Sequence, residues 1–261
     1  MSGSALRLLV ALAVVALAGA KVAGEIPRAE RRSGSDFMSR ETRAMQDDDT
    51  ANPGMLAVLE GGALWARKTG ATGRACADCH GDGRASMKGV AARHPAFAAT
   101  VKRPVNLEQR INLCRTDRQQ APALAYESRE LLALTAYVAR QSRGLPIGVT
   151  VDPSTQPFLD RGRAAFYRRQ GQLNLACSQC HDDHWGRRLA GNAIPQAHPT
   201  GYPVYRLEWQ SLGSLQRRLR NCLTGIRAEP YEYGAAELVE LELFLMWRAR
   251  GMAIETPGVR P

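Results

Sequence analysis

The chain has 261 residues, a formal charge of +10 and 44% hydrophobic residues, which is enough for one or two domains with a globular core. The positive charge comes mostly from arginines scattered over both halves without an interleaved aromatic pattern. We therefore expect a solvated basic surface or an anionic partner, and no nucleic-acid binding.

Residues 1–20 predict a secretory signal peptide. Arg7 precedes an apolar run over Leu8–Ala18 that is too short to span a bilayer, and Ala18-Gly19-Ala20 fits a cleavage site, with Ala23 as an alternative. An uncleaved anchor is the other interpretation. No later segment is long and apolar enough to cross a membrane, so we expect a mature protein in the periplasm without a membrane span.

Residues 21–50 are charged and small, and they predict an extended or partly ordered N-terminal arm. Its exposed charges suit it to wrapping a partner protein. An apolar stripe then predicts a helix from about Met55 to Lys68, which Gly70 ends.

Cys76-x-x-Cys79-His80 follows this helix and matches the attachment sequence of c-type haem. The two thiols form thioethers to the porphyrin, and the histidine ligates the iron. A zinc site would need further cysteine or histidine ligands, and a redox Cys-x-x-Cys pair would not need His80. Haem c is therefore the favoured interpretation.

The rest of this half has an order that recurs later in the chain. His94-Pro95 comes first, and then two helices are predicted over Leu107–Cys114 and Glu130–Arg143. A proline-rich linker over 144–157 separates this half from the next.

The second half repeats the order with a helix from Gly162, a second haem motif and a final helix to Arg250. Cys114 and Cys222 are 108 residues apart, and the closing glycines Gly144 and Gly251 are 107 apart. A nearly constant offset indicates two copies of one unit. We expect a mainly α fold of two class I cytochrome c-like domains related by internal duplication, over residues 51–147 and 148–261. The matched segments of the second half are Cys177-x-x-Cys180-His181, His198-Pro199, Leu215–Cys222 and Glu237–Arg250.

Each iron needs a second axial ligand opposite His80 or His181. Cys114 and Cys222 occupy equivalent positions on helices expected to face the haems, and a thiolate is a strong iron ligand. A Cys114–Cys222 disulfide and buried structural thiols remain alternatives. Methionines are less favoured as ligands, because they suit core packing or lie too near the motif; they are Met87, Met246 and Met252. Histidines are also less favoured, because hydrogen bonds within loops suit them better; they are His94 and His198.

Arg218 lies four residues before Cys222, on the same face of the helix, and Arg110 has the same relation to Cys114. Either arginine could pair with a haem propionate or hold an anion beside the sulfur. The spacing does not decide which haem would be the active one.

The chain resembles the SoxA family because it has two Cys-x-x-Cys-His motifs that are each followed by a further cysteine. The second of these further cysteines lies in the run Arg218-Leu219-Arg220-Asn221-Cys222-Leu223-Thr224-Gly225-Ile226-Arg227. Members of this family are the dihaem cytochrome subunits of periplasmic L-cysteine S-thiosulfotransferase. The resemblance runs from about Met55 to Ile254 and implies two haem c groups with His/Cys ligation. It implies Cys222 as the catalytic cysteine, often a persulfide, and Arg218 as a substrate-binding residue. Cys76, Cys79, Cys177 and Cys180 would hold haem covalently, with axial ligands His80 and Cys114 on haem 1 and His181 and Cys222 on haem 2.

The implied enzyme conjugates thiosulfate to a cysteine of the SoxYZ carrier protein and passes two electrons through haem to a SoxX cytochrome partner. A dihaem electron-transfer cytochrome without a substrate site is the main alternative, but it needs methionine or histidine ligands. A dihaem peroxidase needs an open iron site with an acid–base residue beside it, and we find no such arrangement. A thiosulfate-oxidising enzyme that uses no carrier stays open.

Overall fold

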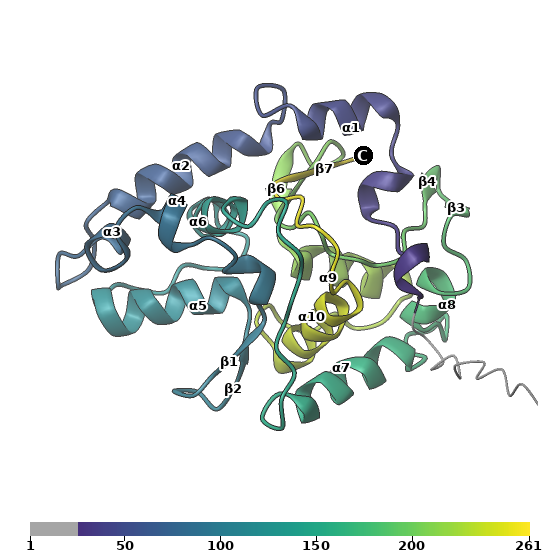
Figure 1. Ribbon diagram of the computed structural model, residues 1–261. Helices are drawn as coiled ribbons and strands as arrows, with labels where there is room; N and C mark the ends of the chain where they lie inside the picture. The colour runs from purple at the N-terminus through teal and green to yellow at the C-terminus, as the bar shows by residue number, and fades with distance from the viewer. Residues whose placement is uncertain (1–25) are drawn as a thin grey trace, which may run out of the picture.

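The computed structural model describes residues 26–261, so the predicted signal peptide over 1–20 lies outside the described part. The fold is mainly helical (Figure 1). Within residues 26–261, no helix is long and apolar enough to cross a membrane. The α-helices are α1 (Arg40–Asp47), α2 (Gly54–Ala66), α3 (Cys76–His80), α4 (Gly83–Ser86), α5 (Leu107–Cys114), α6 (Arg129–Arg140), α7 (Gln156–Tyr167), α8 (Cys177–His181), α9 (Leu215–Gly225) and α10 (Ala236–Arg248).

One pair of crossing helices forms the frame of each half: α2 packs on α6, and α7 packs on α10. A glycine sits at each crossing. A Cβ at Gly61 would collide with the carbonyl oxygen of Ala133, and one at Gly162 with that of Glu240. The close approach of the helix backbones therefore requires glycine at both positions.

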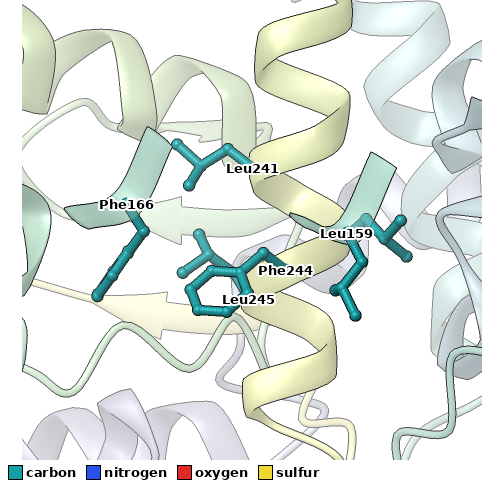
Figure 2. Close-up of a cluster of buried hydrophobic side chains, with 6 residues drawn as sticks. Leu159, Phe166, Leu241, Phe244 and Leu245 are labelled. Carbon is teal, nitrogen blue, oxygen red and sulfur yellow. The ribbon is translucent and has the colours of Figure 1, made fainter. Parts of the chain in front are cut away.

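The core of the second half lies between α7 and α10 (Figure 2). Phe166 from α7 packs against Phe244 from α10, with ring centroids 5.4 Å apart. Both side chains are almost completely buried. Burying a phenylalanine contributes roughly 1.5–3 kcal/mol, so this pair contributes substantially to the stability of the half.

Short antiparallel strand pairs precede α5 and α9. Strands β1 (Ala96–Ala98) and β2 (Arg103–Val105) form the first, and β5 (Val204–Arg206) and β6 (Ser211–Gly213) form the second. The second pair gains a parallel strand, β7 (Gly258–Arg260), beside β5. A further hairpin, β3 (Arg188–Leu189) with β4 (Asn192–Ala193), lies only in the second half.

The positions of these elements correct one match made from the sequence. Strands β1 and β5 begin 108 residues apart, as do α5 and α9. At this offset the counterpart of His94 is Tyr202, and not His198 as expected. The stretch that contains β3 and β4 lengthens the chain between the haem motif and the strands, which separates His198 from the matched position.

The predicted linker is shorter than expected and partly ordered. Helix α7 begins at Gln156, and Pro157 lies in its first turn, where a missing backbone N–H costs nothing. The segment before it pairs with the end of the chain. The Gly144 N–H donates to the Ile254 carbonyl at 2.8 Å, and the Ile147 N–H donates to the Met252 carbonyl at 2.8 Å. These bonds join the two halves.

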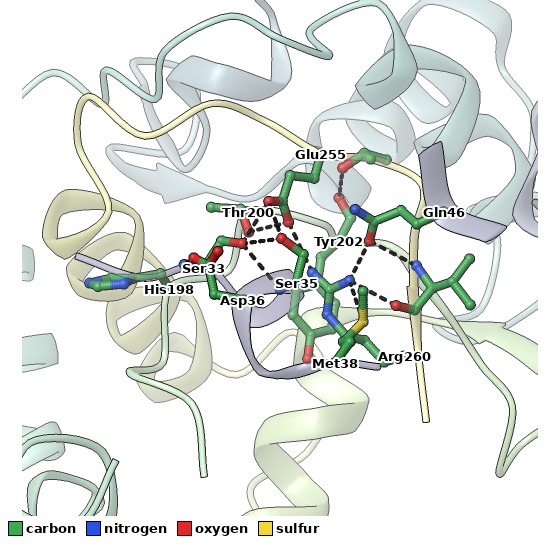
Figure 3. Close-up of polar contacts among 12 residues, drawn as sticks. Ser33, Ser35, Asp36, Met38, Gln46, His198, Thr200, Tyr202, Glu255 and Arg260 are labelled. Carbon is green, nitrogen blue, oxygen red and sulfur yellow. Dashed lines mark hydrogen bonds and ion pairs between the residues drawn. The ribbon is translucent and has the colours of Figure 1, made fainter. Parts of the chain in front are cut away.

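The N-terminal arm is not extended, and the described part folds onto the second half of its own chain. Two 3-10 turns, η1 (Arg28–Glu30) and η2 (Gly34–Phe37), lead into α1. Ser33 and Ser35 donate to the Glu255 carboxylate at 2.6 and 2.9 Å (Figure 3). The signal missed in the sequence is a capping box, in which the backbone N–H of Ser33 donates to Asp36 at the start of η2.

Two buried carboxyl groups lie where the halves meet, Glu108 on α5 and Glu242 on α10. Glu242 accepts hydrogen bonds from the side-chain amides of Asn106 at 3.1 Å and Gln216 at 2.6 Å. Burial raises the pKa of both carboxyls, and the neighbouring Glu108 raises that of Glu242 further. The interface is therefore built around carboxyl groups that favour the neutral form.

The pKa of each carboxyl is higher in the folded protein than in the unfolded chain. The unfolded chain therefore loses these protons first as pH rises. Stability should therefore fall from roughly pH 4.3 upward, until the folded carboxyls also ionise. Glu242→Gln keeps the oxygen that accepts both amide hydrogen bonds but cannot ionise. Between about pH 6 and pH 9, we expect the unfolding free energy of this variant to fall by roughly 1–3 kcal/mol less than that of the wild-type protein. Denaturant titrations at both pH values measure the difference.

Glu237→Gln is the matched control, because Glu237 lies on the same helix with an exposed side chain. It should leave the pH dependence unchanged. A Glu242→Gln protein that keeps the full wild-type slope would show that this carboxyl ionises normally in the folded state.

Candidate functional site

Each haem motif forms a five-residue helix, α3 or α8, whose first turn is closed by a side chain. The Asp78 carboxylate accepts the backbone N–H of Ala75 at 2.8 Å, and the Gln179 amide oxygen accepts that of Ala176 at 2.9 Å. These bonds satisfy an N–H group that the helix leaves free. The turn places both cysteines and the following histidine along one short segment.

The first motif opens on a cavity of about 240 Å³. His80 on one side and Cys114 from α5 both line it, so the structure brings these two predicted residues together. The other walls are largely apolar, and they include Trp65, Leu107 and Val138. The cavity is lined by residues of the first half alone.

The second motif opens on a larger cavity of about 390 Å³. His181 and Cys222, from α9, line it together with Arg218. Four of the predicted site residues are therefore paired as expected: His80 with Cys114, and His181 with Cys222. Within residues 26–261, no three histidine, cysteine, aspartate or glutamate side chains converge as a metal site.

The ring of His181 is oriented by the backbone. Its Nδ1 lies 2.6 Å from the carbonyl oxygen of Pro195. A carbonyl can only accept a hydrogen bond, so Nδ1 donates a proton to it and the Nε2 side of the ring faces away from this bond. Metal-bound histidines are commonly fixed in this way. His181 is thus prepared to ligate an iron through Nε2.

Cys114 and Cys222 are not joined to one another. All six cysteines are free, and these two line different cavities. The proposed disulfide between the halves is therefore wrong for this structure. Cys222 faces His181 closely enough for a side-chain hydrogen bond between them.

The surroundings of Cys222 favour its thiolate. Burial acts to raise the pKa of this thiol, but the hydrogen bond to His181 and the charges of Arg218 and Arg206 outweigh it, so the pKa is lowered. Thiolates are the form of cysteine that ligates metals and attacks sulfur. The second cavity therefore holds a cysteine whose pKa is lowered by its neighbours.

The arginines differ between the cavities in their access to water. Arg74, Arg110 and Arg118 line the first cavity, and all three are exposed. Four arginines line the second cavity. Arg188 is exposed and Arg260 is paired with Glu255, whereas Arg218 is partly buried and Arg206 is only 8% exposed. Charges shielded from water act more strongly on an anion. Arg206, which sequence reasoning missed, comes from strand β5 and not from a motif.

Three of the alternative ligands also line the cavities: Met87 and His94 the first, and His198 the second. His94 Nδ1 bonds to the Val90 carbonyl at 2.9 Å and His198 Nδ1 to the Arg32 carbonyl at 2.8 Å, as expected for loop histidines. Met246 packs in a buried cluster with Met252, away from both haem cavities. Met87 lies in the wall of the first cavity.

The N-terminal arm forms one wall of the second cavity, an arrangement that sequence reasoning also missed. Phe37 and Met38 from the arm line it, and Phe37 packs edge-on against Trp185 with ring centroids 6.3 Å apart. Glu255 holds the arm in place: besides the two serines, it binds Arg260 at 3.0 Å (Figure 3). The first cavity has no wall from this arm.

Comparisons with known proteins show the family of the chain. The family described as SoxA/TsdA, cytochrome c domain, matches residues 60–147 and 161–254. The L-cysteine S-thiosulfotransferase subunit SoxA of Pseudaminobacter salicylatoxidans is 38% identical over 90% of this chain and 82% of its own. That of Rhodovulum sulfidophilum is 37% identical over 88% and 80%. The crystal structure of SoxXA from P. pantotrophus aligns with a TM-score of 0.85 at 30% identity, over 88% of this chain and 87% of that one.

If Glu255 anchors the arm, Glu255→Ala should release it from the second cavity. Losing several hydrogen bonds to one carboxylate costs roughly 1.5–3 kcal/mol, which raises the open fraction about ten- to a hundred-fold. We expect tryptic cleavage within residues 31–43 to accelerate accordingly, as followed by mass spectrometry of the fragments. Glu60→Ala removes an exposed ion pair to Arg129 and serves as the control. Equal cleavage rates in both variants would contradict the anchoring role.

Proposed function

This chain belongs to the SoxA/TsdA cytochrome c domain family, and we propose that it is the cytochrome subunit of an L-cysteine S-thiosulfotransferase. The proposed reaction joins thiosulfate to a cysteine of a carrier protein. The relatives that support it are named for this activity and match most of the chain. The observation that carries the proposal is the placement of Arg218 and Cys222 in one cavity, one helical turn apart.

Haem c is the cofactor of cytochrome c domains, and both cavities fit it. The first cavity brings together both motif cysteines, His80 and Cys114 on a largely apolar background. The second is lined by His181 and Cys222, and the motif cysteines stand on the same short helix as His181. We propose two haem c groups, held covalently by the motif cysteines. The proposed axial ligands are His80 and Cys114 on haem 1, and His181 and Cys222 on haem 2. When bound, haem supplies the acceptor for the electrons that the reaction releases.

The conversion balances as R–SH + S₂O₃²⁻ → R–S–S–SO₃⁻ + H⁺ + 2e⁻, where R is the carrier. A sulfur–sulfur bond forms, and two sulfur atoms are oxidised. In this proposal Arg218 holds the sulfonate oxygens, since a guanidinium fork matches an oxyanion. Two-electron oxidation would join the Cys222 thiolate to the sulfane sulfur of thiosulfate as Cys222–S–S–SO₃⁻. The carrier thiolate would then attack that sulfane sulfur, take the whole S₂O₃ group as R–S–S–SO₃⁻ and release the Cys222 thiolate.

The partners follow from the same proposal. A SoxX cytochrome would form a heterodimer with this chain, as the SoxXA complex of P. pantotrophus suggests, and SoxYZ would present the carrier cysteine. The arm packs on its own chain, so a SoxX partner would meet a folded surface and not an extended arm. Covalent haem and the predicted signal peptide favour the periplasm as the location.

We also propose that the chain is an internal duplication of two cytochrome c-like domains, over residues 51–147 and 148–261. The constant offset between β1 and β5 and between α5 and α9 supports this. So do the matching helix crossings at Gly61 and Gly162. The family match over two separate stretches is consistent with the division.

The test compares two arginines in equivalent positions. Arg218→Ala should lower the rate of thiosulfate conjugation about ten- to more than a hundred-fold, the effect of losing one charge-assisted hydrogen bond made mainly in the transition state. Both haem spectra should stay intact. Arg110→Ala should do much less, because Arg110 lies exposed at the first cavity. The assay follows sulfur transfer to the SoxYZ carrier with a cytochrome acceptor.

An equal loss of activity in the two variants, or a larger loss in Arg110→Ala, would show that the proposal assigns the chemistry to the wrong haem. If Arg218→Ala still oxidises thiosulfate when no carrier is present, the result would favour an enzyme that oxidises thiosulfate without a carrier.

A further inference from the structure

Arg206 lies at the end of strand β5, in the wall of the Cys222 cavity. Two neighbours fix its side chain. The Nη2 group donates to the Glu208 carboxylate at 3.0 Å, and the guanidinium carbon lies 5.1 Å from the centre of the Trp209 ring. The side chain is therefore held in one place although no sequence motif marks it.

One donor of this fixed guanidinium has no acceptor. The Nε–H of Arg206 is buried and makes no hydrogen bond within the described chain. Buried donors without a partner are rare in folded proteins because each one costs stability. An acceptor from outside the chain would satisfy this group.

The local charge favours an anion as that acceptor. Burial lowers the pKa of Arg206, and the charge of nearby Arg218 lowers it further. The residues that line the cavity include no aspartate or glutamate side chain. Glu208 offsets the charge only weakly, because its side chain is 63% exposed to water. Two like charges are thus held together on the wall of one cavity.

The first half lacks this group at the matching position. The residue 108 before Arg206 is Ala98, at the end of β1, whereas the residue 108 before Arg218 is Arg110. The two halves thus share the helix arginine but not the strand arginine. Arg206 is therefore a specific difference between the two cavities.

We propose that Arg206 is a second oxyanion-binding residue of the Cys222 cavity, which holds a thiosulfate-type dianion together with Arg218. This inference rests on the proposed function and adds a substrate-binding residue to it. One guanidinium comes from a strand and the other from a helix, so they can contact different sulfonate oxygens. The sulfane sulfur then remains free to meet Cys222.

The test measures thiosulfate binding separately from turnover. Equilibrium dialysis of radiolabelled thiosulfate against the reduced holoprotein prevents conjugation, because no electron acceptor is available. Arg206→Gln should raise the dissociation constant about ten- to a hundred-fold, and Arg206→Lys should recover part of the loss. Arg217→Gln is the matched control, since Arg217 packs on the same Trp209 ring but does not line the cavity.

A wild-type dissociation constant in Arg206→Gln would overturn this inference. In that case a shifted potential of haem 2 would assign Arg206 to a haem carboxylate, and an unchanged potential would leave it a structural role. A wild-type holoprotein that binds no thiosulfate would overturn the proposed function, and the inference with it. Haem content and the absorption spectrum show whether each variant has folded.

Discussion

A pair of guanidinium groups held beside one cysteine sulfur is the constraint on which the second cavity depends. Arg218 reaches the cavity from α9, Arg206 from β5, and both act on Cys222. Holding two cations close together away from water costs free energy, so neighbouring parts of the fold must hold both side chains in place. Trp209 and Glu208 do this for Arg206, and the α9 helix does it for Arg218. The arm adds one wall to this cavity.

The two halves share a frame and differ in what they place around it. Glycine crossings, a short haem-motif helix and a cysteine-bearing helix recur in both. The second half adds a hairpin, a third strand and the arm, and its cavity is the larger one. In the proposed function the first cavity, with exposed arginines and apolar walls, would hold a haem that only transfers electrons. The second would be the substrate site.

The sequence was sufficient to predict the local features. Short spacings and helical periodicity predict the two motifs, the helix over Leu107–Cys114 and the pairing of each histidine with a cysteine. The structure contains all of these features. The arm, Arg206 and the Tyr202 match were missed because they depend on contacts between distant segments. Glu255 lies 222 residues from Ser33, so no local pattern could show that bond.

The most direct test of this account is the fate of the Cys222 sulfur. The oxidised holoprotein is incubated with thiosulfate in the absence of carrier, then digested and analysed by mass spectrometry without reducing agents. We expect a thiosulfate-derived sulfur adduct on the peptide that contains Cys222, and none on the Cys114 peptide. An adduct on Cys114, or full transfer to a carrier while Cys222 stays unmodified throughout, would contradict the account.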